Sequence, residues 1–194
     1  IDLSQPAEVI SREFGRGLAR SPFQNAGVAH GDMAVTGQTT AKFSGACLTL
    51  GDILVDDSEV PDDYKVPKQR LTEWEYLKGA KSIEREHAGG GKYMYSEGSM
   101  AFPDLLDRPS RTILTGEGGS SPSRFKHIIK TSRGYRRLTP LELERLNGFP
   151  DNWTSEGIAG QVIGDARRAF FMGNALVIGL VERVGKVLAK EIKR

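Results

Sequence analysis

The sequence predicts an α+β protein in which a small, loop-rich β region precedes a set of C-terminal helices. Short runs of β-forming residues, separated by segments rich in glycine, proline and serine, fill most of residues 1–135. From residue 136 to residue 194 the apolar side chains recur at helical spacing instead. We therefore expect two parts, 1–135 and 136–194, because 194 residues allow one domain or two small ones.

In the first part, a short helix is predicted at Ala7–Glu13, followed by irregular chain with one short strand. A second helix is expected over 73–86, because Thr72 and Glu75 have the Thr-x-x-Glu spacing of a capping box. Strands are expected at the alternating tyrosines of "KYMYS" and at the runs "RTILT" and "FKHIIK".

In the second part, "RRLTPLELERLNGFPDNWT" contains strong start and stop signals for a helix. Thr139 can cap the helix, Pro140 suits its first turn, and Glu142 completes a capping box. Gly148 can end the helix. Arg137 is expected to be structural and to pair with a carboxylate.

A last helix is expected near the C-terminus, where apolar residues form one stripe and charged residues face the other way. Such a stripe needs a large apolar neighbour. Its members are Val177, Val181, Val184, Leu188 and Ile192.

Charge is unevenly distributed although the formal net charge is only +2. Residues 52–63 contain six acidic residues and no basic one, whereas residues 108–137 contain eight basic residues and one acid, a surplus of +7 (8 − 1). This surplus favours a surface for a polyanion and a solvated basic face about equally.

Cysteine and histidine usage excludes several classes of site. The single cysteine, Cys47, rules out an internal disulfide, and we expect it to be a buried core thiol. His30, His87 and His127 are far apart in the sequence, so no metal site is expected. No apolar run is long enough to span a bilayer and no signal peptide is evident, so no membrane contact is expected.

Two runs in this order, "RRLTPLELERLNGFPDNWT" and "FFMGNALVIGLVERVG", resemble the ninth and tenth signature motifs of the cytosine-5 DNA methyltransferases of bacterial restriction-modification systems. The resemblance covers 85–194 clearly and the first 84 residues loosely. It implies that 1–135 is a target recognition domain. It also implies that 136–194 completes an α/β, Rossmann-like catalytic domain, with the capped helix seating one part on the other.

The resemblance also implies site residues. Two glycine-rich loops correspond to the recognition loops of the family, with Arg124 suited to guanine, Glu117 to a cytosine amino group and Thr112 to phosphate. The expected DNA-binding residues are Arg85, His87, Lys92, Arg111, Thr112, Glu117, Arg124 and Lys126. The residues expected beside the methyl donor, S-adenosylmethionine, are Gly173, Asn174, Ala175 and Leu176. From physics alone, Asn174 is an equally good helix N-cap.

The family's Pro-Cys nucleophile, Glu-Asn-Val run and Phe-x-Gly-x-Gly loop do not occur in these 194 residues. We therefore expect a fragment or processed product that is inactive alone, with its catalytic half upstream of Ile1 or on another polypeptide. The expected partners are double-stranded DNA, that catalytic half, and a second copy of the chain through 176–193. A bacterial cytoplasmic location is implied.

Two alternatives stay open. One is a non-enzymatic DNA-binding specificity subunit. The other is a helix-turn-helix protein, because "LTPLELERL" resembles the first helix of that motif, although "GFPDNWTSEGIAG" is poorly suited to supply the second.

Overall fold

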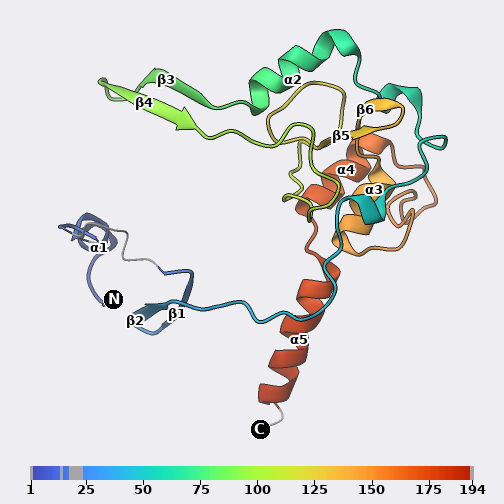
Figure 1. Ribbon diagram of the computed structural model, residues 1–194. Helices are drawn as coiled ribbons and strands as arrows, with labels where there is room; N and C mark the ends of the chain where they lie inside the picture. Colours follow the sequence, from blue (N-terminus) through green and yellow to red (C-terminus); the bar gives the residue numbers. More distant parts are fainter. Residues whose placement is uncertain (1, 14, 18–23, 193–194) are drawn as a thin grey trace. The chain divides into compact units, whose positions relative to one another are not determined.

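The computed structural model describes residues 2–13, 15–17 and 24–192 and divides the chain into two compact units, Ile1–Ala46 and Cys47–Arg194 (Figure 1). The first unit contains helix α1 (Ala7–Glu13) and an antiparallel hairpin of β1 (Ala26–His30) and β2 (Met33–Gly37). The bounds predicted for the first helix are confirmed. Where one strand was predicted there are two.

The second unit begins with three 3-10 turns, Gly51–Ile53, Asp62–Tyr64 and Lys68–Arg70, which lead into helix α2 (Leu71–Lys78). The predicted span 73–86 is wrong. The 3-10 turn at Lys68–Arg70 starts the helix before Thr72, so Thr72 lies inside it and no side chain caps it. Gly79 is extended and ends the helix.

Two further hairpins follow. Strands β3 (Lys81–Glu86) and β4 (Lys92–Glu97) pair antiparallel, which confirms the strand predicted at the tyrosines. Strands β5 (Ile128–Thr131) and β6 (Gly134–Arg137) form the second hairpin, so "FKHIIK" is confirmed in part. The strand predicted at "RTILT" is absent from the described residues of this run, which pack against a helix rather than beside another strand.

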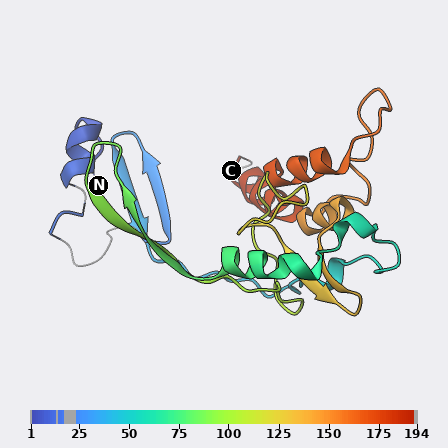
Figure 2. The same ribbon diagram turned by 90° about the horizontal axis from the view of Figure 1, so that it is seen from above.

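Three helices complete the unit: α3 (Pro140–Asn147), α4 (Asp165–Asn174) and α5 (Ile178–Ile192). Helix α4 was not predicted. The β3–β4 hairpin extends away from the packed part formed by α3, α4 and β5–β6 (Figures 1 and 2), and α5 extends away from it in another direction (Figure 1). None of the helices among the described residues combines the length and the hydropathy that a bilayer-spanning segment requires.

The main core of this unit lies between α3, α4 and the loops that precede them. Its buried members come from both sides of residue 135 and include Leu50, Ile53, Ile113, Ile129, Leu143 and Met172. The border between compact units thus lies at 46/47, while a division of roles at 135/136 stays a prediction.

Candidate functional site

Helix α3 is held at its N-terminus by the carboxylate of Glu142. The capping box is present: the Thr139 hydroxyl accepts from the Glu142 amide at 3.3 Å, and the Glu142 carboxylate accepts from the Thr139 amide at 2.8 Å. Gly148 ends the helix in the left-handed conformation, with φ of 78°. Both signals read from the sequence are therefore confirmed.

The same carboxylate is also the partner of a buried arginine. Glu142 is 0% exposed and accepts two hydrogen bonds from Arg136, at 2.8 and 2.9 Å, while Asp57 accepts another at 3.0 Å. Burial opposes the charge of Arg136, but the hydrogen bonds and charges of Glu142 and Asp57 outweigh it and raise its pKa. The prediction that Arg137 pairs with a carboxylate is wrong, because Arg137 donates to the main-chain oxygen of Asp63.

The acidic and basic segments of the sequence contact each other. Besides the Arg136–Asp57 pair, Arg133 donates to the main-chain oxygen of Asp57 at 3.1 Å. Most of the basic residues between 108 and 137 are not exposed; the partly or fully buried ones are Arg111, Arg124, Lys126, Arg136 and Arg137. Much of the +7 surplus therefore belongs to side chains that are not exposed. The surface of this segment is less basic than its sequence predicts.

The loop at 115–127, expected to touch DNA, is fastened from within. Lys126 is buried and donates to the main-chain oxygens of Gly119 and Ser121 at 3.0 and 2.8 Å, and burial lowers its pKa. Glu117 is buried too and accepts from the amide of His127 at 2.6 Å. In this structure both side chains hold the loop rather than face outward.

Two arginines tie this loop to its neighbours. Arg124 donates to the main-chain oxygens of Leu77, Gly79 and Gly98 and lies 3.2 Å from a Glu97 carboxylate oxygen. Arg124 therefore connects the loop to the base of the β3–β4 hairpin, where β3 begins and β4 ends. Arg111 donates to main-chain oxygens of the loop, at Phe125 and Lys126.

The second partner of Arg111 is a buried ion-pair cluster around Asp104. The Asp104 carboxylate accepts hydrogen bonds from Arg111 at 2.7 Å, from Lys78 at 3.3 Å and from the Ile128 amide at 2.8 Å. Burial works against its charge, but Arg111 and Lys78 prevail and lower the pKa of Asp104. Burial also lowers the pKa of Lys78. The cluster fixes the end of α2 against β5.

The β3–β4 hairpin presents Arg85, His87 and Lys92 at the surface. The Arg85 guanidinium lies 3.7 Å from the ring centroid of Tyr95, while Lys92 pairs with Glu84 at 2.6 Å. Of the residues expected to bind DNA, these three and Thr112 are exposed.

The segment expected beside the methyl donor joins α4 to α5. A Cβ on Gly173 would lie 2.4–2.5 Å from main-chain atoms of Leu114 and Thr115, so a larger residue cannot fit there without movement. Asn174 is the last residue of α4 and its amide donates to the Phe170 oxygen at 3.0 Å. The alternative role of Asn174 as an N-cap is therefore wrong, because α5 begins later.

A second glycine, Gly118 of the loop, also permits a close contact with α4. A Cβ on Gly118 would lie 3.0 Å from Cα of Ala166 in α4. Residues 114–118 thus run directly against α4, with a glycine at each of the two closest points. This contact joins the second expected recognition loop to the tenth-motif helix.

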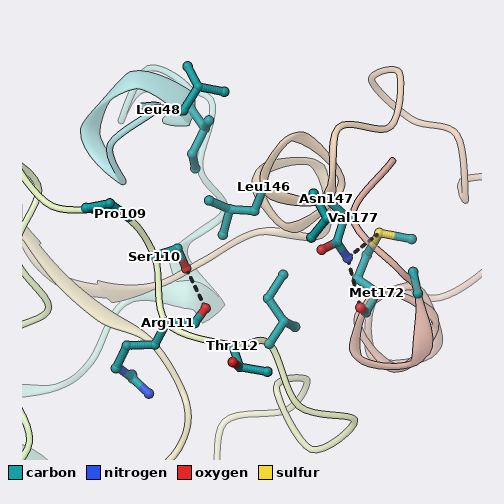
Figure 3. Close-up of a pocket in the computed structure, with 12 residues that line it drawn as sticks. Leu48, Pro109, Ser110, Arg111, Thr112, Leu146, Asn147, Met172 and Val177 are labelled. Carbon is teal, nitrogen blue, oxygen red and sulfur yellow. Dashed lines mark hydrogen bonds between the residues drawn. The ribbon is translucent and has the colours of Figure 1, made fainter. Parts of the chain in front are cut away.

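A cavity of about 350 Å³ lies beside this junction (Figure 3). Figure 3 shows Ser110, Arg111 and Thr112 on one side, with Asn147, Met172 and Val177 opposite, where the Asn147 amide donates to the Met172 oxygen at 2.9 Å. Arg111 and Thr112 line this cavity together with Ala175.

Sequence reasoning missed the pair that connects α3 to α4. Glu144 is 0% exposed and accepts from Arg168 at 3.0 Å and from the Thr154 amide at 2.9 Å. Although burial disfavours the charged form, these partners lower the pKa of Glu144. No short motif signals a pair separated by 24 residues.

The expectation for Cys47 is wrong. Its side chain is exposed, and residues 38–48 around it contain no helix or strand and belong to neither core cluster. Among the described residues, no group of three or more His, Cys, Asp and Glu side chains could hold a metal ion.

Comparison with known proteins gives two results. Residues 37–190 match a family model described as C-5 cytosine-specific DNA methylase. The chain is also 40% identical, over 168 residues, to the Type II methyltransferase M.Sau3AI of Staphylococcus aureus. The matched region is 87% of this chain but 38% of that relative, so the chain corresponds to less than two thirds of the relative's length.

Proposed function

The chain belongs to the C-5 cytosine-specific DNA methylases, and from this premise we propose that it is the DNA-recognition part of a DNA cytosine-5 methyltransferase. In the whole enzyme a cytosine leaves the duplex and a cysteine adds to C6 before C5 is methylated. S-adenosylmethionine supplies the methyl group. Neither a Pro-Cys dipeptide nor a Glu-Asn-Val run is present in the 194 residues, so this chain supplies recognition and not the nucleophile.

The observation that carries this proposal is the close contact between residues 114–118 and α4. Gly118 and Gly173 let the main chain of the recognition loop lie directly on the helix of the tenth motif. The buried Arg136–Glu142 pair holds the base of the neighbouring β5–β6 hairpin on α3. Recognition and completion of the catalytic domain then depend on one rigid junction.

We assign the residues expected beside the methyl donor to one wall of its site. Asn174 and Leu176 are exposed, so an amide and an apolar side chain can face a bound nucleoside. The space beside Gly173 is filled by the main chain of the recognition loop. Gly173 therefore permits packing and does not open space for the donor. The other walls have to come from residues outside this chain.

The two alternatives differ in how well they agree with the structure. A helix-turn-helix needs its second helix after a short turn. Residues 148–164 contain no helix, and α4 packs in the core through Ala169 and Met172. A separate specificity subunit acting in trans remains compatible, with the same chemistry. We place either form in the bacterial cytoplasm, within a restriction-modification system.

A chimaera tests the proposal. The 168-residue matched segment of M.Sau3AI is replaced by the corresponding residues of this chain, and methyl transfer from labelled S-adenosylmethionine to duplex DNA is followed. We expect 5-methylcytosine at one short site with the chimaera and none with the 194-residue chain alone. A chimaera that folds, by circular dichroism, and transfers nothing would overturn the proposal.

The exposed Cys47 requires its own control. We expect Cys47→Ser to leave the activity of the chimaera unchanged. Methyl transfer by the 194-residue chain alone, lost in Cys47→Ser, would instead make this residue the nucleophile.

A further inference from the structure

A hydrogen-bonded network of Ser110, His127 and Glu117 lies inside the second unit. Nδ1 of His127 is 3.0 Å from Glu117 Oε1, and Nε2 is 3.1 Å from the Ser110 hydroxyl oxygen. The order serine, histidine, acid is that of a hydrolase triad. His127 is 0% exposed, however, so its ring can neither protonate a leaving group nor activate a water molecule. The network is therefore suited to positioning and not to hydrolysis.

Glu117 fixes the orientation of the imidazole. Its Oε1 accepts from the main-chain amide of His127 at 2.6 Å and also faces Nδ1, so Nδ1 carries the hydrogen. Among the described residues the other oxygen, Oε2, is buried without a hydrogen-bond partner. His127 thus supplies the hydrogen bonds that the Glu117 carboxylate receives, and Nε2 is left facing Ser110.

The main chain on both sides of His127 is held by the ion-pair cluster around Asp104. The main-chain oxygen of Lys126 accepts from Lys78 at 2.8 Å. The main-chain amide of Ile128 donates to Asp104 at 2.8 Å. The imidazole is therefore attached to a fixed backbone, and the position of Nε2 is set before any ligand binds.

At the other end of the network, Ser110 precedes the segment that carries Thr112. The Ser110 hydroxyl is within hydrogen-bond distance of His127 Nε2 and, at 2.9 Å, of the main-chain oxygen of Arg111. On the far side of Thr112, Ile113 is buried in the main core. Thr112 is exposed and makes no hydrogen bond among the described residues, and Figure 3 shows it on the same side of the cavity as Ser110. Its position therefore depends on the anchored residues that flank it.

Resting on the proposed function and on the expected contact of Thr112 with phosphate, we infer that His127 is a positioning residue for DNA binding. Through the Ser110 hydroxyl, the imidazole holds the segment 110–112 in the conformation that meets the DNA backbone. A contact that is ordered before binding loses less conformational entropy when the complex forms. The affinity for DNA then depends on the bond between His127 and Ser110, although neither side chain has to touch DNA.

Kinetic constants distinguish positioning from a purely stabilising role. If the bond between His127 and Ser110 only stabilised the fold, its loss would lower the amount of active enzyme, and therefore kcat, with the KM values unchanged. If the bond positions Thr112, KM for duplex DNA rises, whereas kcat and KM for S-adenosylmethionine stay the same.

Ser110→Ala in the chimaera with M.Sau3AI tests the inference, because it removes the hydroxyl and leaves His127 bound to Glu117. We expect KM for duplex DNA to rise roughly 2- to 10-fold, with kcat and KM for S-adenosylmethionine unchanged. His127→Asn should give the same result, because its amide can still donate to Glu117 but does not reach Ser110. Ser155→Ala is the matched control: this hydroxyl is also half-buried and donates to the main-chain oxygen of Asn152 at 2.7 Å, and its loss should change neither KM.

The 194-residue chain provides readouts that need no catalysis. In its nitrogen NMR spectrum, Ser110→Ala should move the Nε2 resonance of His127 and leave the Nδ1 resonance in place, because only the bond to Ser110 is lost. The same variant should bind duplex DNA roughly 2- to 10-fold more weakly than the parent. Ser155→Ala should alter neither the spectrum of the ring nor the affinity.

The results separate the inference from the proposed function. A chimaera that methylates DNA, with KM for DNA unchanged in Ser110→Ala, would contradict the inference alone, as would an Nε2 resonance that does not move. A lower kcat with both KM values unchanged would reduce the network to a stabilising role. A folded parent chimaera that transfers no methyl group would refute the proposed function, and the inference with it. If Ser110→Ala does not fold, His127→Asn decides by the same measurements.

Discussion

At the scale of single residues, buried carboxylates organise the loops around them. Glu142 caps α3 and binds Arg136, Glu144 binds Arg168 from α4, and Asp104 binds Lys78 and Arg111. Because each of these charges is removed from water, losing a partner leaves an unpaired buried charge, which is strongly destabilising.

Thr139→Ala should lower the free energy of unfolding by about 0.5–2 kcal/mol, because the capping hydroxyl of α3 is lost. Thr72→Ala is the matched control: it lies in the same Thr-x-x-Glu pattern in α2 but is exposed and caps nothing. Urea denaturation followed by circular dichroism measures both. Equal changes in the two variants would show that the capping bond adds no stability.

Asp104→Asn should cost about 3–5 kcal/mol at pH 7, because it leaves Lys78 buried without its carboxylate. The pKa of Asp104 is lowered in the folded state, so its ionised form adds stability that is fully present above its usual pKa of 3.8. That stability is lost as the pH falls through the lower folded value.

The difference between parent and Asp104→Asn should therefore shrink below pH 3.8, as measured by urea denaturation across the acidic range. The exposed neighbour Asp107 provides the control, and Asp107→Asn should be neutral throughout. A difference that stays constant down to pH 2 would contradict this assignment.

At the scale of elements, one close main-chain contact joins an irregular segment to a helix. Residues 114–118 lie on α4, and the glycines that permit this are one from each partner, Gly118 and Gly173. The segment therefore does not form the strand that its β-forming residues favour, because tertiary packing overrides a local propensity of this size.

Gly173→Ala tests this contact, since the added methyl group would meet main-chain atoms at 2.4–2.5 Å. We expect a loss of about 1–3 kcal/mol in the free energy of unfolding. Gly185→Ala in α5 has open space around its Cβ and should instead be neutral or more stable by up to about 1 kcal/mol. Stabilisation by both substitutions would mean that the contact can relax freely.

At the scale of the whole molecule, the second unit presents a helix, α5, whose apolar stripe is left exposed. None of the side chains of α5 is buried. The predicted apolar stripe is 44% exposed at Val177, just before α5, and 47% and 57% exposed at Val181 and Leu188 within it. An exposed apolar patch of this kind favours association. In the whole enzyme we propose that this stripe packs on the catalytic half.

In the isolated chain we expect α5 to pair with a second copy. Sedimentation equilibrium should show a dimer that weakens when Val181 and Leu188 are both changed to glutamate, which places charges in the stripe. Lys190→Glu, on the polar side, is the control and should leave the dimer intact. A parent chain that stays monomeric at high concentration would contradict this prediction.

The local features of this protein could be predicted from its amino-acid sequence. Thr139, Glu142 and Gly148 act within a few residues of one another, so the bounds of α3 could be read directly. The α1 helix, the strand at Tyr93 and Tyr95, and the amphipathic last helix could be predicted for the same reason. The two motifs that carry the family resemblance also lie in continuous runs.

Tertiary structure alone decided which charged side chains remain available to a ligand. Arg124 and Lys126 look like DNA contacts in the sequence, but both bind oxygens that no local pattern predicts. Arg85 keeps its position at the surface because, within the described residues, β4 is the only strand that pairs with β3. Hydrogen bonds and ion pairs between distant segments form only when the core brings those segments together, so a charge count along the chain could not distinguish internal fasteners from a binding surface.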